Sequence, residues 1–262
     1  MATLIGCSGW SYAHWRDPVY DGAPAGRWLG LYAERFPTVE VNASFYRLPT
    51  LRMAQGWAER APDGFVFAVK MSRYVTHIRR LRDVPANVAL LMRRIEPLAA
   101  AGKLGPLLWQ LPESFPRDDE RLAAALRALP EGRNCFEFRH PSWFCPEVRK
   151  LLADAGAALV VGDHPQRPYQ TLEPTADWMY VRFHHGARGR RGNYSETELR
   201  EWARRIRGWG RRGDVYVYFN NDWEGFAVRN AERLQALLAE LSRSASSPSA
   251  TRRHATSPLR RR

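Results

Sequence analysis

Apolar and polar side chains alternate along residues 38–46 of the chain. Val39 and Val41 fall on one face of an extended segment, because successive side chains of a strand point to opposite sides. Glu40 and Asn42 fall on the other face. The same alternation recurs in seven further segments, and in nearly all of them the polar residues stand at the downstream end. A closed barrel of parallel strands with a polar mouth explains this pattern.

Segments with helical periodicity separate the expected strands. The strands are expected at residues 4–10, 38–46, 65–70, 106–112, 134–140, 157–163, 178–184 and 214–220. The helices are expected at 28–36, 52–60, 84–101, 118–129, 144–155, 195–208 and 223–241. Only the crossover between the sixth and seventh strands, which is rich in proline, should be irregular. Strands that alternate with helices in this way predict an α/β fold, a (β/α)8 TIM-type barrel.

The chain divides into one expected barrel domain, residues 1–241, and a tail, residues 242–262. The tail is rich in Ser, Pro and Arg and lacks apolar periodicity, so we expect it to be disordered. The formal net charge of the whole chain is +13. The tail holds six arginines and no acids, which leaves +7 on the barrel. That charge is only a modest indication of an anionic partner.

The three cysteines, Cys7, Cys135 and Cys145, are odd in number and lack metal-type or redox spacing. We expect reduced thiols, with Cys7 and Cys135 buried inside strands. The first residues have no signal-peptide pattern, and no segment approaches the roughly 20 apolar residues of a membrane span. The expectation is a soluble, cytoplasmic protein with no membrane partner, whose oligomeric state stays open.

The polar face of each strand should point into the barrel, because helices cover the outer face. Barrel active sites form at the carboxyl ends of the strands, and an unpaired buried charge there is costly. An ion pair such as Glu137 with Arg139, or Glu40 with Lys70, could explain any one position. Seven of eight strands that end in polar groups favour a ligand site. The residues expected at this rim are Glu40, Asn42, Lys70, Gln110, Glu137, Arg139, Asp163, Arg182, His184 and Asn220.

A set of short motifs resembles one known family. The motifs are Gly9-Trp10-Ser11-Tyr12, Val39-Glu40-Val41-Asn42 with Phe45-Tyr46, Phe67-Ala68-Val69-Lys70 with Thr76-His77, Gln110-Leu111-Pro112, Glu137-Phe138-Arg139-His140 with Trp143, Arg182-Phe183-His184 and Tyr218-Phe219-Asn220-Asn221-Asp222. In this order they are similar to the YecE-like family, a domain of unknown function, over residues 4 to about 241. The resemblance implies a TIM-type barrel without an established reaction. One departure, His184-His185-Gly186 in place of a single histidine, leaves open which imidazole faces the site.

The favoured function is an enzyme that acts on a small anionic or phosphorylated, sugar-like substrate, although the sequence leaves open whether the protein is an enzyme. Lys70, Arg139 and Arg182 would bind the anion. Glu137 or Glu40 would transfer protons, and His184 would titrate near neutrality. The basic loop 186–192 is either a phosphate site or an ordinary solvated loop. The further candidate ligand-binding residues are Trp10, Asn42, Tyr46, His77, Gln110, Asp163, Asn220 and Asp222.

Nucleic-acid binding or processing is the main alternative. The family's barrels are similar in shape to the xylose isomerase-like and endonuclease-four-like group, which implies sugar-phosphate or nucleic-acid substrates. The basic barrel and tail could bind nucleic acid non-specifically, and four aromatic residues could stack on bases or serve in packing. These four are Trp10, Trp15, Tyr46 and Trp143.

Glycoside hydrolysis by Glu40 and Glu137 is a further alternative, and so is a ligand sensor without catalysis. Nearby cations oppose the raised pKa that a general acid needs. They also make a bound divalent metal a minor alternative, so no metal ligands are assigned. Motifs for nucleotide cofactors and serine nucleophiles are absent from the sequence, and no cofactor is identified.

Overall fold

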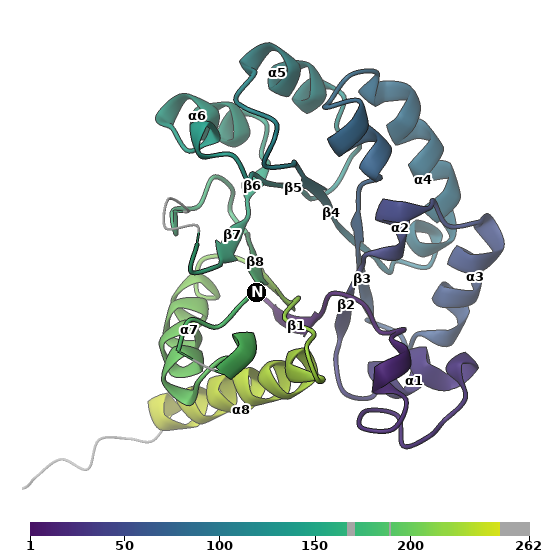
Figure 1. Cartoon of the computed structure of the whole chain (residues 1–262), viewed down its shortest axis with the longest axis vertical. Coiled ribbons are helices and arrows are strands. Elements are labelled where there is room, and N and C mark those ends of the chain that lie inside the picture. Colours follow the sequence, from purple (N-terminus) through teal and green to yellow (C-terminus); the bar gives the residue numbers. More distant parts are fainter. Residues whose placement is uncertain (167–170, 189, 247–262) are drawn as a thin grey trace, which may run out of the picture.

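Parallel strands form a ring at the centre of the molecule (Figure 1). The computed structural model describes residues 1–166, 171–188 and 190–246. The strands are β1 (Thr3–Cys7), β2 (Thr38–Val41), β3 (Val66–Lys70), β4 (Leu104–Gln110), β5 (Asn134–Glu137), β6 (Ala158–Leu159), β7 (Val161–Asp163), β8 (Met179–Phe183) and β9 (Val215–Phe219). They follow the order β6-β5-β4-β3-β2-β1-β9-β8-β7.

The first and last strands in this order, β6 and β7, are two halves of one expected strand. Strands β6 and β7 are separated only by Val160, whose amide donates a hydrogen bond of 2.9 Å to the carbonyl of Phe136 on β5. Strand β6 pairs with β5, and β7 pairs with β8. The predicted eight-stranded TIM-type barrel is therefore confirmed, with its sixth strand interrupted once.

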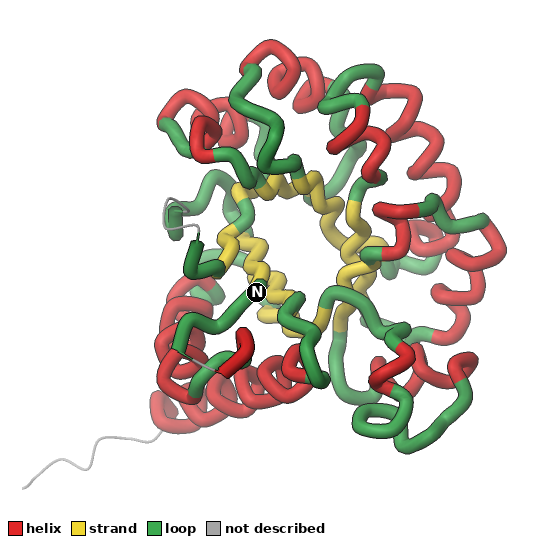
Figure 2. Tube along the Cα trace, viewed as in Figure 1, coloured by secondary structure: helices red, strands yellow, loops and turns green. Residues whose placement is uncertain are grey.

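Helices surround the strand ring on the outside (Figure 2). They are α1 (Trp28–Ala33), α2 (Ala43–Tyr46), α3 (Leu51–Arg60), α4 (Val84–Ala100), α5 (Asp119–Arg127), α6 (Pro146–Asp154), α7 (Glu196–Trp209) and α8 (Phe226–Ser246). Helix α5 begins where the Asp118 side chain accepts from the amide of Arg121, and α7 begins with a capping box of Ser195 and Glu198. Between β7 and β8, the described residues contain no helix, as expected.

The two faces of the strands pack into separate apolar clusters. The outer cluster, under the helices, includes Val41 and Val69. The inner cluster fills the barrel and includes Ala68, Cys135 and Tyr180. This separation confirms that alternate residues of β3, β5 and β8 point into the barrel. The expected burial of the Cys7 and Cys135 thiols is also confirmed.

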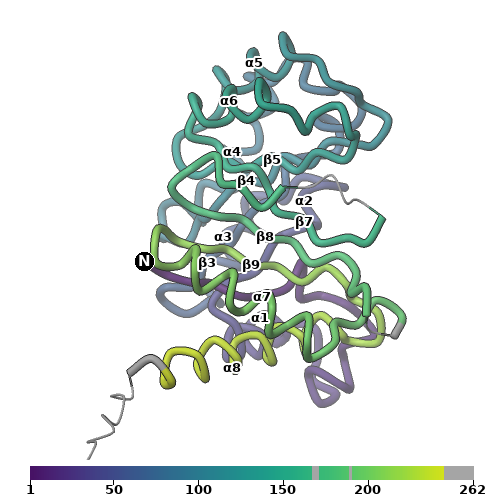
Figure 3. Tube along the Cα trace, turned by 90° about the vertical axis from the view of Figure 1, so that its left-hand side faces the viewer, coloured from purple at the N-terminus to yellow at the C-terminus, as the bar shows by residue number. Residues whose placement is uncertain are grey.

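Helix α8 is longer than the sequence pattern indicated. It continues five residues past Leu241 to Ser246, so the expected barrel boundary cuts its last turns. The remainder of the expected tail, residues 247–262, lies outside the described residues. Figure 3 shows the last turn of α8 at the same end of the barrel as the N-terminus. In the described part of the chain, no helix is long and apolar enough to cross a membrane.

Candidate functional site

A buried ionic network lies where β2, β5 and β8 reach the barrel mouth. The Arg182 guanidinium bridges two carboxylates, donating from Nη2 to Glu40 Oε1 at 2.7 Å and from Nη1 to Glu137 Oε2. The exposed fractions of the three side chains are 1% for Arg182, 0% for Glu40 and 1% for Glu137. The network holds its charges in fixed positions, because each oxygen of both carboxylates has a partner.

Glu40 is enclosed on every side by its partners. Its Oε1 also accepts from Ser8 Oγ at 2.7 Å, and its Oε2 accepts from Tyr180 OH at 2.7 Å. Burial alone would raise the pKa of Glu40, but Arg182, with smaller effects from Lys70 and Tyr180, brings the pKa below its usual range. Glu40 is thus an ionised carboxylate that a substrate cannot reach without moving the strands.

Glu137 is surrounded by cations and an imidazole. Its Oε1 accepts from Arg139 Nη2 at 3.0 Å and from His184 Nε2 at 3.0 Å. Burial opposes the charge, but Arg139 and Arg182 together hold the pKa of Glu137 well below its usual range. Glu137 therefore stays ionised through the neutral range, which suits a carboxylate that orients its neighbours.

His184 is the imidazole that faces the network. Its Nδ1 lies 3.2 Å from Asn220 Nδ2, and since an amide nitrogen only donates, Nδ1 accepts and Nε2 carries the proton given to Glu137. Burial lowers the pKa of His184 to about 4, against the attraction of Glu137. His184 is therefore neutral near pH 7. The sequence led us to expect that it titrates near neutrality, and the lowered pKa contradicts this expectation. His185 is exposed.

His77 lies on the other side of the mouth, in a short π-helix over Tyr74–Ile78. Its ring packs edge-on against Phe45 with centroids 4.9 Å apart, and its Nε2 lies 3.4 Å from Gln110 Nε2. Burial, and next Lys70, lower the pKa of His77 to about 4. Single π-helical turns are frequent at functional sites.

Lys70 ends β3 and points to the floor of a pocket. Its side-chain nitrogen lies 4.2 Å from the centroid of the Phe45 ring, and the residue is 8% exposed. Burial, and next the Arg182 charge, lower the pKa of Lys70 to about 7, while Glu40 and Glu137 oppose the change only in part. Lys70 is consequently the group of this site whose pKa lies near neutrality.

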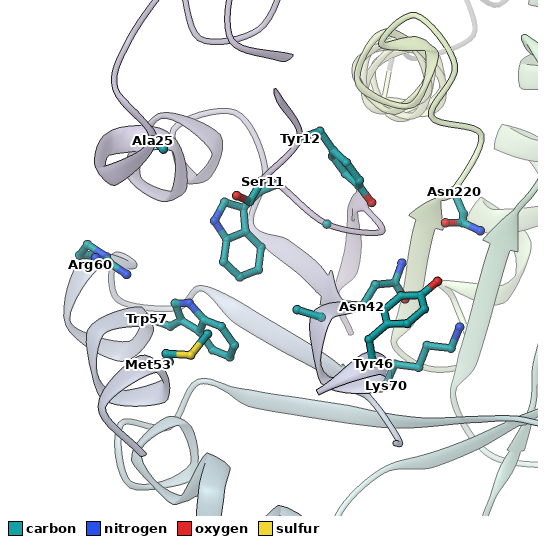
Figure 4. Close-up of a pocket in the computed structure, with 13 residues that line it drawn as sticks. Ser11, Tyr12, Ala25, Asn42, Tyr46, Met53, Trp57, Arg60, Lys70 and Asn220 are labelled. Carbon is teal, nitrogen blue, oxygen red and sulfur yellow. The ribbon is translucent and has the colours of Figure 1, made fainter. Parts of the chain in front are cut away.

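The pocket has a volume of about 640 Å³ and opens above these residues. Asn42, Tyr46, Lys70 and Asn220 form its polar end, at the carboxyl ends of the strands (Figure 4). Its other lining residues are Gly9, Trp10, Ser11, Tyr12, Ala25, Ala43, Met53, Trp57 and Arg60. A pocket of this size holds a small molecule.

Helix α3 supplies a wall of the pocket that the sequence analysis missed. Met53, Trp57 and Arg60 are spaced by four and three residues, so they share one face of α3. Figure 4 shows these three side chains together on the side away from Lys70. The Trp57 ring meets the Trp10 ring edge-on with centroids 5.5 Å apart. The helical spacing was visible in the sequence, but nothing there distinguished this face from one packed on the core.

Four expected residues have surroundings that differ from the prediction. The Asp163 carboxylate faces outward and accepts from the indole of Trp202 on α7 at 2.8 Å, because Val160 rather than Asp163 lies on the inner face of this strand. The Asp222 carboxylate accepts from Trp15 Nε1 at 2.7 Å and fixes the loop after β1 without lining the pocket. Trp15 and Trp143, expected as stacking surfaces, are packing residues with 0% and 1% exposure.

The basic loop after β8 already binds a carboxylate of the chain itself. The amides of Ala187 and Arg188 donate to Glu198 Oε1 at 2.7 Å and 3.0 Å. The Arg188 and Arg191 side chains pair with Glu201 and Glu224. These described amides are therefore occupied, and an anion would have to displace Glu198 to use them.

The described residues contain no group of three or more histidine, cysteine or acidic side chains arranged to hold a metal ion. Glu40 and Glu137, the two carboxylates at the mouth, are both bound by Arg182. The structure thus assigns no metal ligands among these residues.

Comparison with known families identifies the family to which the chain belongs. A family model described as "Protein of unknown function DUF72" matches residues 4–254. The chain belongs to the DUF72 family. The YecE-like family, which the motifs resemble, is the same family under a different name.

Relatives of this DUF72 protein match over nearly their whole length. The UPF0759 protein YunF of Bacillus subtilis (strain 168) is 26% identical over 270 residues, which cover 89% of this chain and 94% of that protein. The crystal structure of a DUF72 family protein from Thermotoga maritima MSB8 is 29% identical, with a TM-score of 0.82 over 91% of this chain and 100% of that chain. A DUF72 family protein from Enterococcus faecalis V583, at 21% identity, has the same fold, with a TM-score of 0.75 over 91% of this chain and 98% of that chain.

Proposed function

We propose that this DUF72 protein is an enzyme that acts on a small anionic, sugar-like substrate bound in the pocket at the barrel mouth. One observation carries the proposal: a buried ionic network of Glu40, Glu137 and Arg182 lies beneath a pocket whose floor holds a lysine with a pKa of about 7. Buried charges are costly to the fold, and pKa values perturbed by burial and specific neighbours cluster at functional sites.

The residues divide into those that hold the site and those that meet the substrate. Glu40 and Arg182 are almost fully buried and position the others. Lys70 and Arg60 line opposite sides of the pocket and would attract an anion. Arg139, whose side chain is 22% exposed, pairs with Glu137 at the mouth, and its charge acts on Lys70. Asn42 and Asn220 would hydrogen-bond substrate hydroxyls. Trp10 and Trp57 would pack against the apolar face of a sugar-like carbon chain.

The glycoside-hydrolase alternative has less support. A glycosidase needs one carboxylic acid with a raised pKa to protonate the leaving group. The pKa values of Glu40 and Glu137 are both lowered. Nucleic-acid binding retains the basic charge of the barrel as its support, while two of its four proposed stacking residues, Trp15 and Trp143, are buried.

A binding measurement tests the proposal. Glycerol 3-phosphate carries both chemistries, an anion and hydroxyl groups, and should raise the melting temperature in a saturable way because it binds the folded state. Arg139→Ala should reduce this shift, since Arg139 lies at the mouth beside Glu137. The matched control is Arg188→Ala, which removes an arginine paired with Glu201 outside the pocket and should keep the shift. Equal losses in the two variants would contradict the proposal.

A further inference from the structure

Lysine is rare in this chain. Of its 40 basic residues, 37 are arginine and three are lysine: Lys70, Lys103 and Lys150. The Lys103 amine donates to the carbonyls of Ala58 and Ala61 at 2.8 Å and 2.7 Å. The Lys150 amine pairs with Asp154 on the surface of α6. Two of the three amines therefore have ordinary structural partners.

The Lys70 amine is different. Within the part of the chain that the structure describes, it has no hydrogen-bond acceptor and no ion-pair partner, although the residue is only 8% exposed. Its contact is the face of the Phe45 ring, and its open side is the pocket. An arginine in the same place would bind an anion as well, but arginine never gives up its proton. What lysine adds here is an amine that can become a neutral nucleophile.

The ionic network occupies both nearby carboxylates, so neither of them forms an ion pair with the Lys70 amine. Glu40 and Glu137 are the nearby acids that favour the charged form of Lys70. Arg182 donates a hydrogen bond to each of these carboxylates, and its own charge disfavours an ammonium at Lys70. The arrangement thus lowers the pKa of Lys70 to about 7, so about half of the amine is neutral at pH 7. Arg182 is a positioning residue in this scheme.

We propose that Lys70 forms a covalent imine with the carbonyl carbon of its substrate, a small hydroxylated aldehyde or ketone that carries a phosphate group. This inference rests on the proposed function and names the substrate class and the nucleophile of the same site. The nitrogen lone pair attacks the carbonyl carbon, and the carbonyl oxygen takes a proton from solvent in the open pocket. Loss of that oxygen as water, together with a proton from the nitrogen, leaves the C=N bond. No oxidant or reductant is needed.

The pocket contains the other groups that such a substrate requires. Asn42 and Asn220 stand with Lys70 at the polar end and could bind hydroxyl groups next to the imine carbon (Figure 4). Arg60 lies at the α3 side of the same pocket and could bind the phosphate. Protonated imines withdraw electrons from the neighbouring carbon, so the reaction class is cleavage or formation of a bond to that carbon.

Reductive trapping tests the inference. The protein is incubated at pH 7 with D-glyceraldehyde 3-phosphate and sodium cyanoborohydride, and the adduct is located by peptide mass mapping. We expect Lys70 to be labelled at least about tenfold faster than Lys150, since a desolvated amine with a lowered pKa has far more of its neutral form. Glycerol 3-phosphate, which has no carbonyl, should block the labelling of Lys70.

Two variants and the binding assay separate the outcomes. Lys70→Arg keeps a positive charge but should lose the adduct completely, whereas Lys150→Arg should be labelled like the wild type. Circular dichroism checks that both variants are folded. If glycerol 3-phosphate raises the melting temperature but no adduct forms on Lys70, the imine is overturned and the proposed function stands. Equal labelling of Lys70 and Lys150, or labelling of Lys70 that glycerol 3-phosphate does not block, would show non-specific reaction of surface amines. Either result also overturns the imine proposal. If neither compound binds and no adduct forms, both proposals fail.

Discussion

Replacing Lys70 with methionine should stabilise the fold, most strongly at acid pH. The amine is 8% exposed, and its pKa falls from 10.5 to about 7 on folding. At about 1.4 kcal/mol for each pKa unit, the charged amine costs the folded state about 5 kcal/mol at pH 6. At pH 9 the folded amine is neutral, and the cost falls to about 2 kcal/mol. Lys70→Met should therefore raise the free energy of unfolding by about 3 kcal/mol more at pH 6 than at pH 9.

The sign of this effect follows from proton binding. Between pH 7 and 10.5 the unfolded chain holds the Lys70 proton and the folded chain does not, so the wild type gains stability from this group as the pH rises. Below pH 7 both states are protonated and the contribution is constant. The variant, which lacks the group, has no such slope.

Urea unfolding at pH 6, 7.5 and 9 measures the difference between variant and wild type. Lys150→Met is the control, since it removes an exposed lysine paired with Asp154 and should show a difference that does not depend on pH. A stability gain from Lys70→Met that is the same at all three pH values, or a loss at pH 6, would refute the claim that the Lys70 amine is desolvated and unpaired.

Three further substitutions have distinct expected effects. Arg182→Met leaves two buried carboxylates without their shared cation and should lower the free energy of unfolding by about 3–5 kcal/mol in urea titrations; a loss under 1 kcal/mol would mean that the network is not buried in solution. Arg188→Ala breaks only a surface pair with Glu201 and should change the same quantity by less than about 1 kcal/mol. Ser195→Ala removes the cap of α7 and should cost about 1 kcal/mol, seen as a lower melting temperature.

The sequence determined the barrel and most of the residues at its mouth. Strand alternation has a period of two, so once helices are known to cover one face, the polar residues of β2, β3, β5 and β8 must point inward. Glu40, Lys70, Glu137 and Arg182 all follow this rule. It failed at Asp163, because the strand 157–163 is apolar on both faces and its pattern does not indicate which face is the inner one.

Only the tertiary structure decided how the charges at the mouth are paired. Of the two ion pairs that the sequence suggested, Glu137 with Arg139 is present, whereas Glu40 pairs with Arg182 and not with Lys70. Arg182 also binds Glu137, and Lys70 has no ion-pair partner among the described residues. A pKa depends on burial and on distances of a few ångströms between residues far apart in the chain, and alternation carries neither. The wall supplied by α3 depends in the same way on how that helix packs against the loop after β1. The pattern of the chain thus placed most of the charged residues at the mouth, and packing decided how they are paired and which of them line the pocket.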